Sequence, residues 1–186
     1  MPPASESRQR KKRRARTAWF AGATLLAAAC GAAAAPLSQR DFHHPERVAA
    51  WLTANKHALD TKAAQALFQQ GIQSKQQRRW GPALKSFGES AIRRPSAPTL
   101  IEYAEAHLRL LGEARARENG YAEHQQRDLT SAEQLYRSAL AADAAVPELS
   151  PQQREQTRRS AGCLAEYVHS GSTQEACEPL QSYGLK

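Results

Sequence analysis

The residues from Ala64 to Ala97 read AQALFQQGIQSKQQRRWGPALKSFGESAIRRPSA. This stretch carries two apolar stripes at helical spacing, and the polar run from Gln73 to Arg79 separates them. Gly81-Pro82 opens the second stripe. Pro95 ends it, because the residue before a proline avoids the helical conformation. The stretch therefore predicts two short helices joined by a turn.

Helical spacing continues on both sides of this pair. Apolar residues make up 41% of the chain and many are alanine, which favours helix, while runs of β-branched residues are missing. The chain is predicted to be all-α. We expect helix starts at Pro45, Asp60, Pro98, a Thr130–Glu133 capping box, Ser150-Pro151 and a Ser172–Glu175 cap, with stops at Asn119-Gly120 and Gly171.

Residue size follows a pattern within the opening stretch. Small residues let two helix backbones approach closely, large ones fill the space between helical pairs, and a proline turns the chain. The residues concerned are Gly71, Ala83 and Ser90, then Trp80 and Phe87, and finally Pro95, with Leu67 as a further matching position. This combination resembles one tetratricopeptide repeat, a helix-turn-helix unit of about 34 residues.

A second, looser copy of the pattern follows. Ala132, Tyr136 and Ala139 repeat the spacing of Ala83, Phe87 and Ser90 after 49 residues, which is one repeat plus 15. The resemblance covers residues 61–146 and implies a short solenoid of about two repeats. In that scheme residues 36–60 form a polar linker and a capping helix around Trp51, and residues 147–186 form a C-terminal helical hairpin that caps the other end. The alternative is a generic alanine-rich helical bundle.

The basic residues are concentrated at the N-terminus. Seven of the 26 lie before residue 17, accompanied by one acid of the 18, so the remaining chain holds 19 basic and 17 acidic residues. The basic block could be a nucleic-acid arm, but an uncharged, alanine-rich stretch follows it directly, from Ala18 to Ala35. A positive segment followed by an apolar one and small residues is the pattern of a secretory signal. We therefore expect residues 1–35 to direct export and no nucleic-acid partner.

Three fates of this segment remain open. Cleavage after Ala34 would release a periplasmic protein. Ala27-Ala28-Ala29-Cys30 is similar to a bacterial lipobox, which makes Cys30 a candidate lipidation residue. An uncut segment would be a membrane anchor, although its apolar run is short for a spanning helix. The protein is thus expected in the periplasm, or anchored to the membrane and facing the periplasm.

Two cysteines remain in the body of the chain, Cys163 and Cys177. In an oxidising compartment two cysteines can pair. They lie on either side of Gly171, where the helical hairpin is expected to turn, so the hairpin would bring them together. The sequence predicts a disulfide here, with two unpaired, buried thiols as the alternative.

Catalytic and metal-binding motifs are scarce. The chain contains no G-x-S-x-G, H-E-x-x-H or C-x-x-C motif and no glycine-rich phosphate loop. His43-His44 with Asp41 is interpreted as a solvated part of the linker. Glu89-Ser90 is similar to a residue pair of lytic transglycosylases, but none of the other motifs of that family follows. We expect no enzyme activity, no catalytic residue, no cofactor and no metal.

The resemblance to tetratricopeptide repeats implies a concave groove lined by the first helix of each pair. Its polar positions would contact a partner protein or peptide, and they are Gln69, Gln70, Gln73, Glu102 and Glu105. The expected function is an exported interaction scaffold or adaptor of the bacterial cell envelope. The alternatives are a cell-wall enzyme or its accessory subunit, and a lipid-tethered assembly factor of the envelope.

Overall fold

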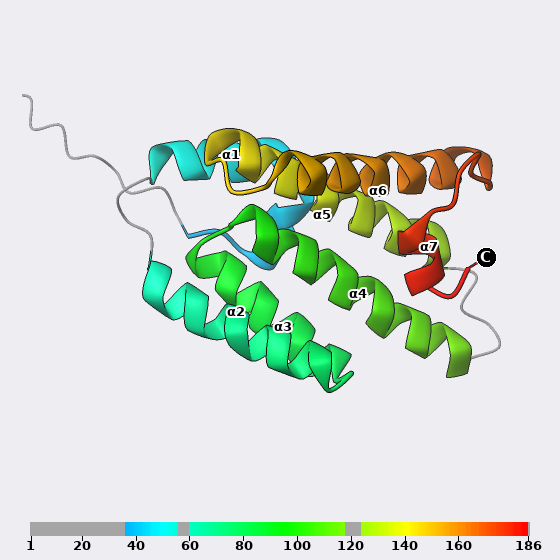
Figure 1. Ribbon diagram of the computed structural model, residues 1–186, viewed down its shortest axis with the longest axis horizontal. Helices are drawn as coiled ribbons and strands as arrows, with labels where there is room; N and C mark the ends of the chain where they lie inside the picture. The colour runs from blue at the N-terminus through cyan, green and yellow to red at the C-terminus, as the bar shows by residue number, and fades with distance from the viewer. Residues whose placement is uncertain (1–35, 56–59, 118–123, 186) are drawn as a thin grey trace, which may run out of the picture. The chain divides into compact units, whose positions relative to one another are not determined.

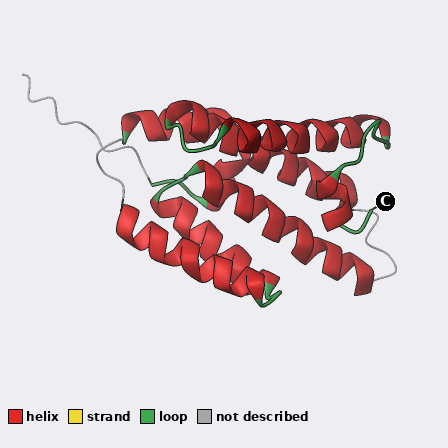
Figure 2. Ribbon diagram, viewed as in Figure 1, coloured by secondary structure: helices red, strands yellow, loops and turns green. Residues whose placement is uncertain are grey.

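Helices make up the regular structure of the part of the chain that the computed structural model describes, residues 36–55, 60–117 and 124–185 (Figure 2). No strand occurs in these residues, so the predicted all-α class is confirmed. The elements are the 3-10 helix η1 (Gln39–His43) and the α-helices α1 (Pro45–Ala54), α2 (Thr61–Gln76), α3 (Trp80–Arg93), α4 (Ala97–Arg117), α5 (Gln125–Ala145), α6 (Pro151–Ser170) and α7 (Glu178–Ser182). The proposed signal segment and the Asn119-Gly120 stop lie outside the described residues.

Several helix ends follow the expected capping chemistry. The Asp60 carboxylate accepts a hydrogen bond from the Ala63 N–H at 3.1 Å and begins α2. Ser150 and Gln153 form a reciprocal capping box at the start of α6. Gly171 ends the same helix with a φ of 76°, a left-handed conformation that favours glycine. Side-chain chemistry next to the backbone thus determines these three boundaries.

Two expected starts are wrong. Helix α5 begins at Gln125, and Thr130 lies inside it with its hydroxyl donating to the Gln126 carbonyl at 2.8 Å. A threonine within a helix can bond back to the preceding turn in this way, so it does not mark a cap. Helix α7 begins at Glu178, not after Ser172. The chain between Gly171 and Cys177 contains no helix.

Consecutive helices pack against one another, α2 on α3, α3 on α4, α4 on α5 and α5 on α6 (Figure 1). Short connections join α2 to α3 and α3 to α4. The N-terminal helix departs from expectation, because α1 packs mainly on α5 and does not cover the outer side of the α2–α3 pair. An apolar stripe shows which side of a helix is buried, but not against which neighbour.

The interface between α2 and α3 is closed by one aromatic ring. Phe87 is fully buried and lies so close to Gly71 that a Cβ there would sit 2.4 Å from the ring. Its ring centroid is 5.7 Å from that of Phe68. The buried Ser90 hydroxyl donates to the Ala64 carbonyl at 2.8 Å, which ties the two helices together. Of the other residues in the repeat-like pattern, Ala83 and Pro95 are buried, and Leu67 and Trp80 are half-buried.

In the second pair, α4 and α5, the residues expected from the looser copy of the pattern are buried. Ala132, Tyr136 and Ala139 on α5 are buried, and so is Ala104 on α4. Their spacing matches that of the first pair. Tyr136 keeps an exposed fraction of 4%, whereas Phe87 keeps none.

The segment expected to be a polar linker contributes to the core. Leu37 is buried and Phe42 is fully buried. The Phe42 ring meets Tyr103 edge-on, with centroids 6.1 Å apart, and its carbonyl accepts a hydrogen bond from the Ser138 hydroxyl at 2.6 Å. A single phenylalanine among polar residues has no periodic partner, so the sequence pattern does not reveal its burial.

Candidate ligand-binding groove

Helix α7 is held beside α6 by a disulfide between Cys163 and Cys177. The sulfur atoms are 2.06 Å apart and the Cα atoms 5.8 Å apart, within the usual range. This confirms the predicted pairing. Cys163 lies within α6, and Cys177 directly precedes α7. The bridge therefore fixes the start of α7.

The other end of α7 rests on α4. A Cβ at Gly112 would lie 2.8 Å from the Ser182 carbonyl oxygen, so only glycine allows this approach. The Arg115 guanidinium donates to the Gly184 carbonyl at 2.8 Å, and the fully buried Tyr183 donates its hydroxyl to Asp128 at 3.2 Å. These contacts make α7 a wall beside α4 and α6.

Two hollows border this wall. The first, here called the α4–α6 hollow, has a volume of about 230 Å³ and is lined by α4, α5, α6 and α7. The second, here called the α2–α4 hollow, has a volume of about 820 Å³ and is lined by α2, α4, α7 and the region around Trp80. Arg109 and Ser182 line both, so the hollows are adjacent. Together they form what we call the groove.

The α2–α4 hollow is predominantly positive. Lys75, Arg78 and Arg109 line it, against one acid, Glu113. The Arg109 guanidinium lies 5.9 Å from the centre of the Trp80 ring, within the range of a cation–π contact. Half-buried Ile72 adds an apolar surface. This hollow combines positive charge with aromatic and aliphatic contact area.

Lys75 connects α2 to α4 across the groove. Its ammonium lies 2.6 Å from a carboxylate oxygen of Glu102 and 2.6 Å from one of Glu105. Burial opposes its charge, but the hydrogen bonds to the two carboxylates outweigh this and raise the pKa of Lys75. Burial raises the pKa of Glu102, and the nearby Glu105 adds to this effect. One cation thus holds two acids together in a half-buried position.

The α4–α6 hollow is predominantly negative. Glu102, Glu105 and Glu178 line it, against Arg109 alone, and Tyr136 forms part of its lining. Burial raises the pKa of the Tyr136 hydroxyl, and the charges of Glu105, Glu178 and Glu102 raise it further. The groove therefore has one positive and one negative half.

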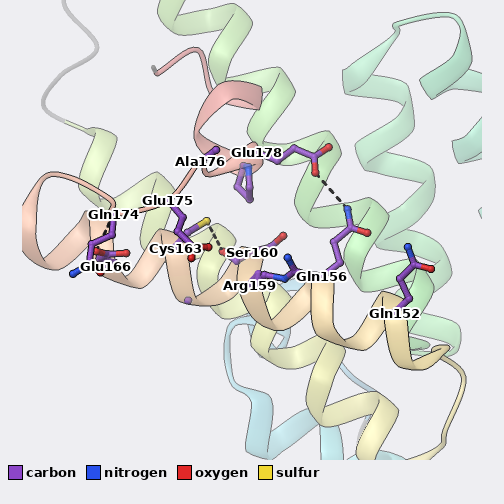
Figure 3. A pocket seen from close by; sticks show the side chains of 12 residues that line it. Gln152, Gln156, Arg159, Ser160, Cys163, Glu166, Gln174, Glu175, Ala176 and Glu178 are labelled. Carbon is purple, nitrogen blue, oxygen red and sulfur yellow. Dashed lines mark hydrogen bonds between the residues drawn. The ribbon is translucent and has the colours of Figure 1, made fainter.

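A third hollow lies beside the disulfide, with Cys163 in its lining and a volume of about 520 Å³ (Figure 3). Its lining comes from α6 and from the chain that leads into α7, including Glu166, Gln174 and Glu175. Figure 3 shows Gln156 of α6 and Glu178 of α7 reaching toward each other, 3.4 Å apart. These two residues line this hollow and the α4–α6 hollow alike.

The groove residues expected from sequence are divided by the structure. Glu102 and Glu105 line the α4–α6 hollow. Gln69, Gln70 and Gln73 are exposed on α2 and do not line either half of the groove. Sequence reasoning missed Lys75, Arg109 and Glu178. A local signal existed for Lys75 alone, because it follows Gly71 by four residues and so lies near it on the same side of the helix.

The residues weighed for catalysis or metal binding do not gather in the groove. The Ser90 hydroxyl is occupied by the Ala64 carbonyl, and Glu89 lies 3.9 Å from Lys85 on α3. His43 is half-buried against the Ser131 carbonyl, which corrects its expected solvated position. In residues 36–55, 60–117 and 124–185, no three His, Cys, Asp or Glu side chains could together hold a metal ion. No helix of this described part is both long and apolar enough to cross a membrane.

The fold and the groove define a class of protein, an all-α, helical repeat-like body with an open polar groove walled by a disulfide-linked helix. No protein-family model, curated protein or solved structure gives a significant match to this chain. The residues of the groove are therefore the best indication of what this protein binds.

Proposed function

We propose that this protein is an exported interaction scaffold of the bacterial cell envelope, with a body similar to tetratricopeptide repeats, and that it binds a partner protein in the groove between α2, α4, α6 and α7. The groove carries this proposal, because charged side chains line it, some of them half-buried and others exposed. The side chains of Ile72, Trp80 and Ile101 provide apolar contact area. Binding surfaces commonly combine an aromatic or arginine anchor with a polar surround.

The wall of the groove supports the same proposal. Only a five-residue helix forms it, yet a disulfide, a close glycine contact and a buried tyrosine hold that helix in place. Keeping a surface in one conformation reduces the entropy lost when a partner binds. A preorganised wall is thus suited to recognition.

Site-specific photo-crosslinking in the native cells tests the proposal. A photoreactive amino acid at Ile72 or Ile101 should yield a defined adduct with an envelope protein. The same amino acid at Lys85, whose side chain on α3 is 77% exposed, should not. Equal adducts from all three positions, or none from the groove, would contradict the proposal.

A matched pair of glycine variants examines the wall. Gly112→Ala forces a methyl group against the α7 backbone, whereas Gly162→Ala on α6 meets nothing within 4 Å. The first variant should reduce the Ile101 adduct and the second should leave it unchanged.

The intact mass of the native protein in each cell fraction tests export. A chain starting near Ala35 indicates cleavage, and added lipid at Cys30 indicates a membrane tether.

A further inference from the structure

The hydroxyl of Tyr136, a residue that lines the α4–α6 hollow, has no hydrogen-bond partner in the described part of the chain. Tyr136 keeps an exposed fraction of only 4%. No residue in the described part of the chain forms a hydrogen bond with its hydroxyl oxygen. In this part of the chain, every fully buried polar side-chain atom has a hydrogen-bond partner. Because the Tyr136 hydroxyl has none, it must be accessible from the hollow that it lines.

Native proteins leave few polar groups on deeply buried side chains without a hydrogen-bond partner. The Tyr136 hydroxyl, which opens onto the hollow, is therefore free to bond to a ligand that enters it. At the matching position of the first pair, fully buried Phe87 carries no polar atom. The tyrosine therefore brings a polar group to a position where packing alone does not need one.

The charges around this hydroxyl indicate the kind of ligand. Three carboxylates from two helices, Glu102, Glu105 and Glu178, face the hollow against one guanidinium. Lys75 neutralises one carboxylate charge from the α2 side. Glu178 has one weak neighbour, the Gln156 amide at 3.4 Å. The hollow thus retains a negative excess, which repels an anion and attracts a cation.

The size of the hollow limits that cation. Its volume of about 230 Å³ lies below the roughly 300–1,000 Å³ of most small-molecule sites. A single side chain suits this space. Carboxylate, amide and hydroxyl oxygens from α4, α6 and α7 surround it, and a planar guanidinium can donate to several such acceptors at once.

We propose that the α4–α6 hollow binds a cationic side chain of the groove partner, an arginine in preference to a lysine, between Tyr136, Glu105 and Glu178. This inference rests on the proposed scaffold function and names the chemistry that the partner must present. The positive α2–α4 hollow, adjacent to it, then favours acidic residues beside that arginine. The expected partner segment is therefore one arginine flanked by acids.

Short blocked peptides test the site with the full chain. Acetyl-Ala-Arg-Ala-amide should bind at least about tenfold more tightly than the same peptide with citrulline, which has the same shape without the charge. The lysine peptide should lie between them. Chemical-shift changes in NMR spectra report both affinity and location, and they should appear at Tyr136 and along α6.

Variants of the lining give a second readout. Glu178→Gln, at an exposed position, should lower affinity for the arginine peptide by about tenfold, and Tyr136→Phe by a few-fold. The matched control is Glu155→Gln, because Glu155 is a carboxylate on α6 that pairs with Arg158. This variant should leave the affinity unchanged. Equal binding of the arginine and citrulline peptides, or no effect of Glu178→Gln, would overturn the proposal.

The experiments separate this inference from the proposed function. If the arginine peptide binds at Tyr136 but no partner crosslinks in the groove, the cation site is supported and the scaffold function is not. If a partner crosslinks at Ile101 and its yield does not change in Glu178→Gln, the scaffold function is supported and the cation site is wrong. If the yield falls with Glu178→Gln alone, and not with Glu155→Gln, both are supported.

Discussion

The α2–α3 pair and the α4–α5 pair place an aromatic residue at the same spacing, but they use it differently. Phe87 closes the first pair by packing onto Gly71, and none of the buried side chains on α2 and α3 is ionisable. The second pair buries Tyr136 together with three acids of α5, Asp128, Glu133 and Asp143. The first pair is closed and buries no ionisable side chain, whereas the second buries three acids and borders a hollow.

Helix length accounts for part of this difference. Helices α2 and α3 have 16 and 14 residues, whereas α4 and α5 have 21 each. The additional turns extend beyond the first pair, and α7 packs against α4 in its second half, at Gly112. The same packing pattern thus gives a closed interface in the short α2–α3 pair and a hollow beside the longer α4–α5 pair.

Removing the closing aromatic ring should have the largest effect. Phe87→Ala deletes a fully buried ring and should lower the free energy of unfolding by about 3–5 kcal/mol. Tyr136→Ala should cost less, because that side chain already borders a hollow. Urea unfolding of both variants measures the difference. Equal losses would show that the two interfaces are packed alike.

The second pair should also make stability depend on pH. Burial, together with a smaller contribution from the charge of His43, lowers the pKa of His107 on α4 to about 4. In the unfolded chain its pKa is about 6.5, so between these values the unfolded state binds more protons. Stability should therefore fall as pH drops from about 6.5 and level off below about 4, by at most about 3 kcal/mol.

The measurement is the difference in unfolding free energy between pH 7 and pH 4. His107→Gln should reduce this difference. His44→Gln, a change at a histidine whose side chain is 52% exposed, should not. If both variants retain the full pH dependence, the carboxylates are responsible for it and His107 is not.

Local chemistry explains which parts of the fold were predictable from sequence. The α2–α3 pair, the caps at Asp60 and Ser150 and the Cys163–Cys177 bridge each depend on residues close in sequence. The position of α1 on α5 and the burial of Phe42 depend on contacts with distant residues. No pattern along the chain encodes which neighbour an apolar stripe will meet.

The groove was predictable only in part for the same reason. Glu102 and Glu105 were named because the resemblance to tetratricopeptide repeats places them on the first helix of a pair. Tyr136 was identified as a packing residue, and its size does fill the interface. Whether its hydroxyl finds a partner depends on α4, α6 and α7 together, and the sequence does not show that.

Exchanging the two aromatic residues is a more delicate test of the comparison. Phe87→Tyr adds a hydroxyl to a fully buried ring beside Gly71 and should cost about 1–3 kcal/mol. Tyr136→Phe removes a hydroxyl that has no partner in the described residues, so it should change stability by less than about 0.5 kcal/mol. Thermal unfolding of the two variants measures both changes in stability. A large loss in Tyr136→Phe would mean that this hydroxyl is structural.

The smallest effect is expected in the turn of the first pair. Arg78 ends α2 with a φ of 56°, and its neighbour Arg79 donates its N–H to the Ser74 carbonyl at 2.9 Å. This is the left-handed helix end at which glycine is preferred, so Arg78→Gly should stabilise the protein by up to about 1 kcal/mol. Arg79→Gly, at a φ of −92°, should give no gain and serves as the control.

Retaining arginine at a position that favours glycine requires a reason other than stability. Arg78 lines the α2–α4 hollow and adds to its positive charge. We therefore expect Arg78→Gly to unfold at a higher temperature while it yields less of the Ile72 crosslink. If the variant gains stability and keeps the full crosslink yield, the α2–α3 pair is a structural support only, and recognition belongs to the α4–α5 pair alone.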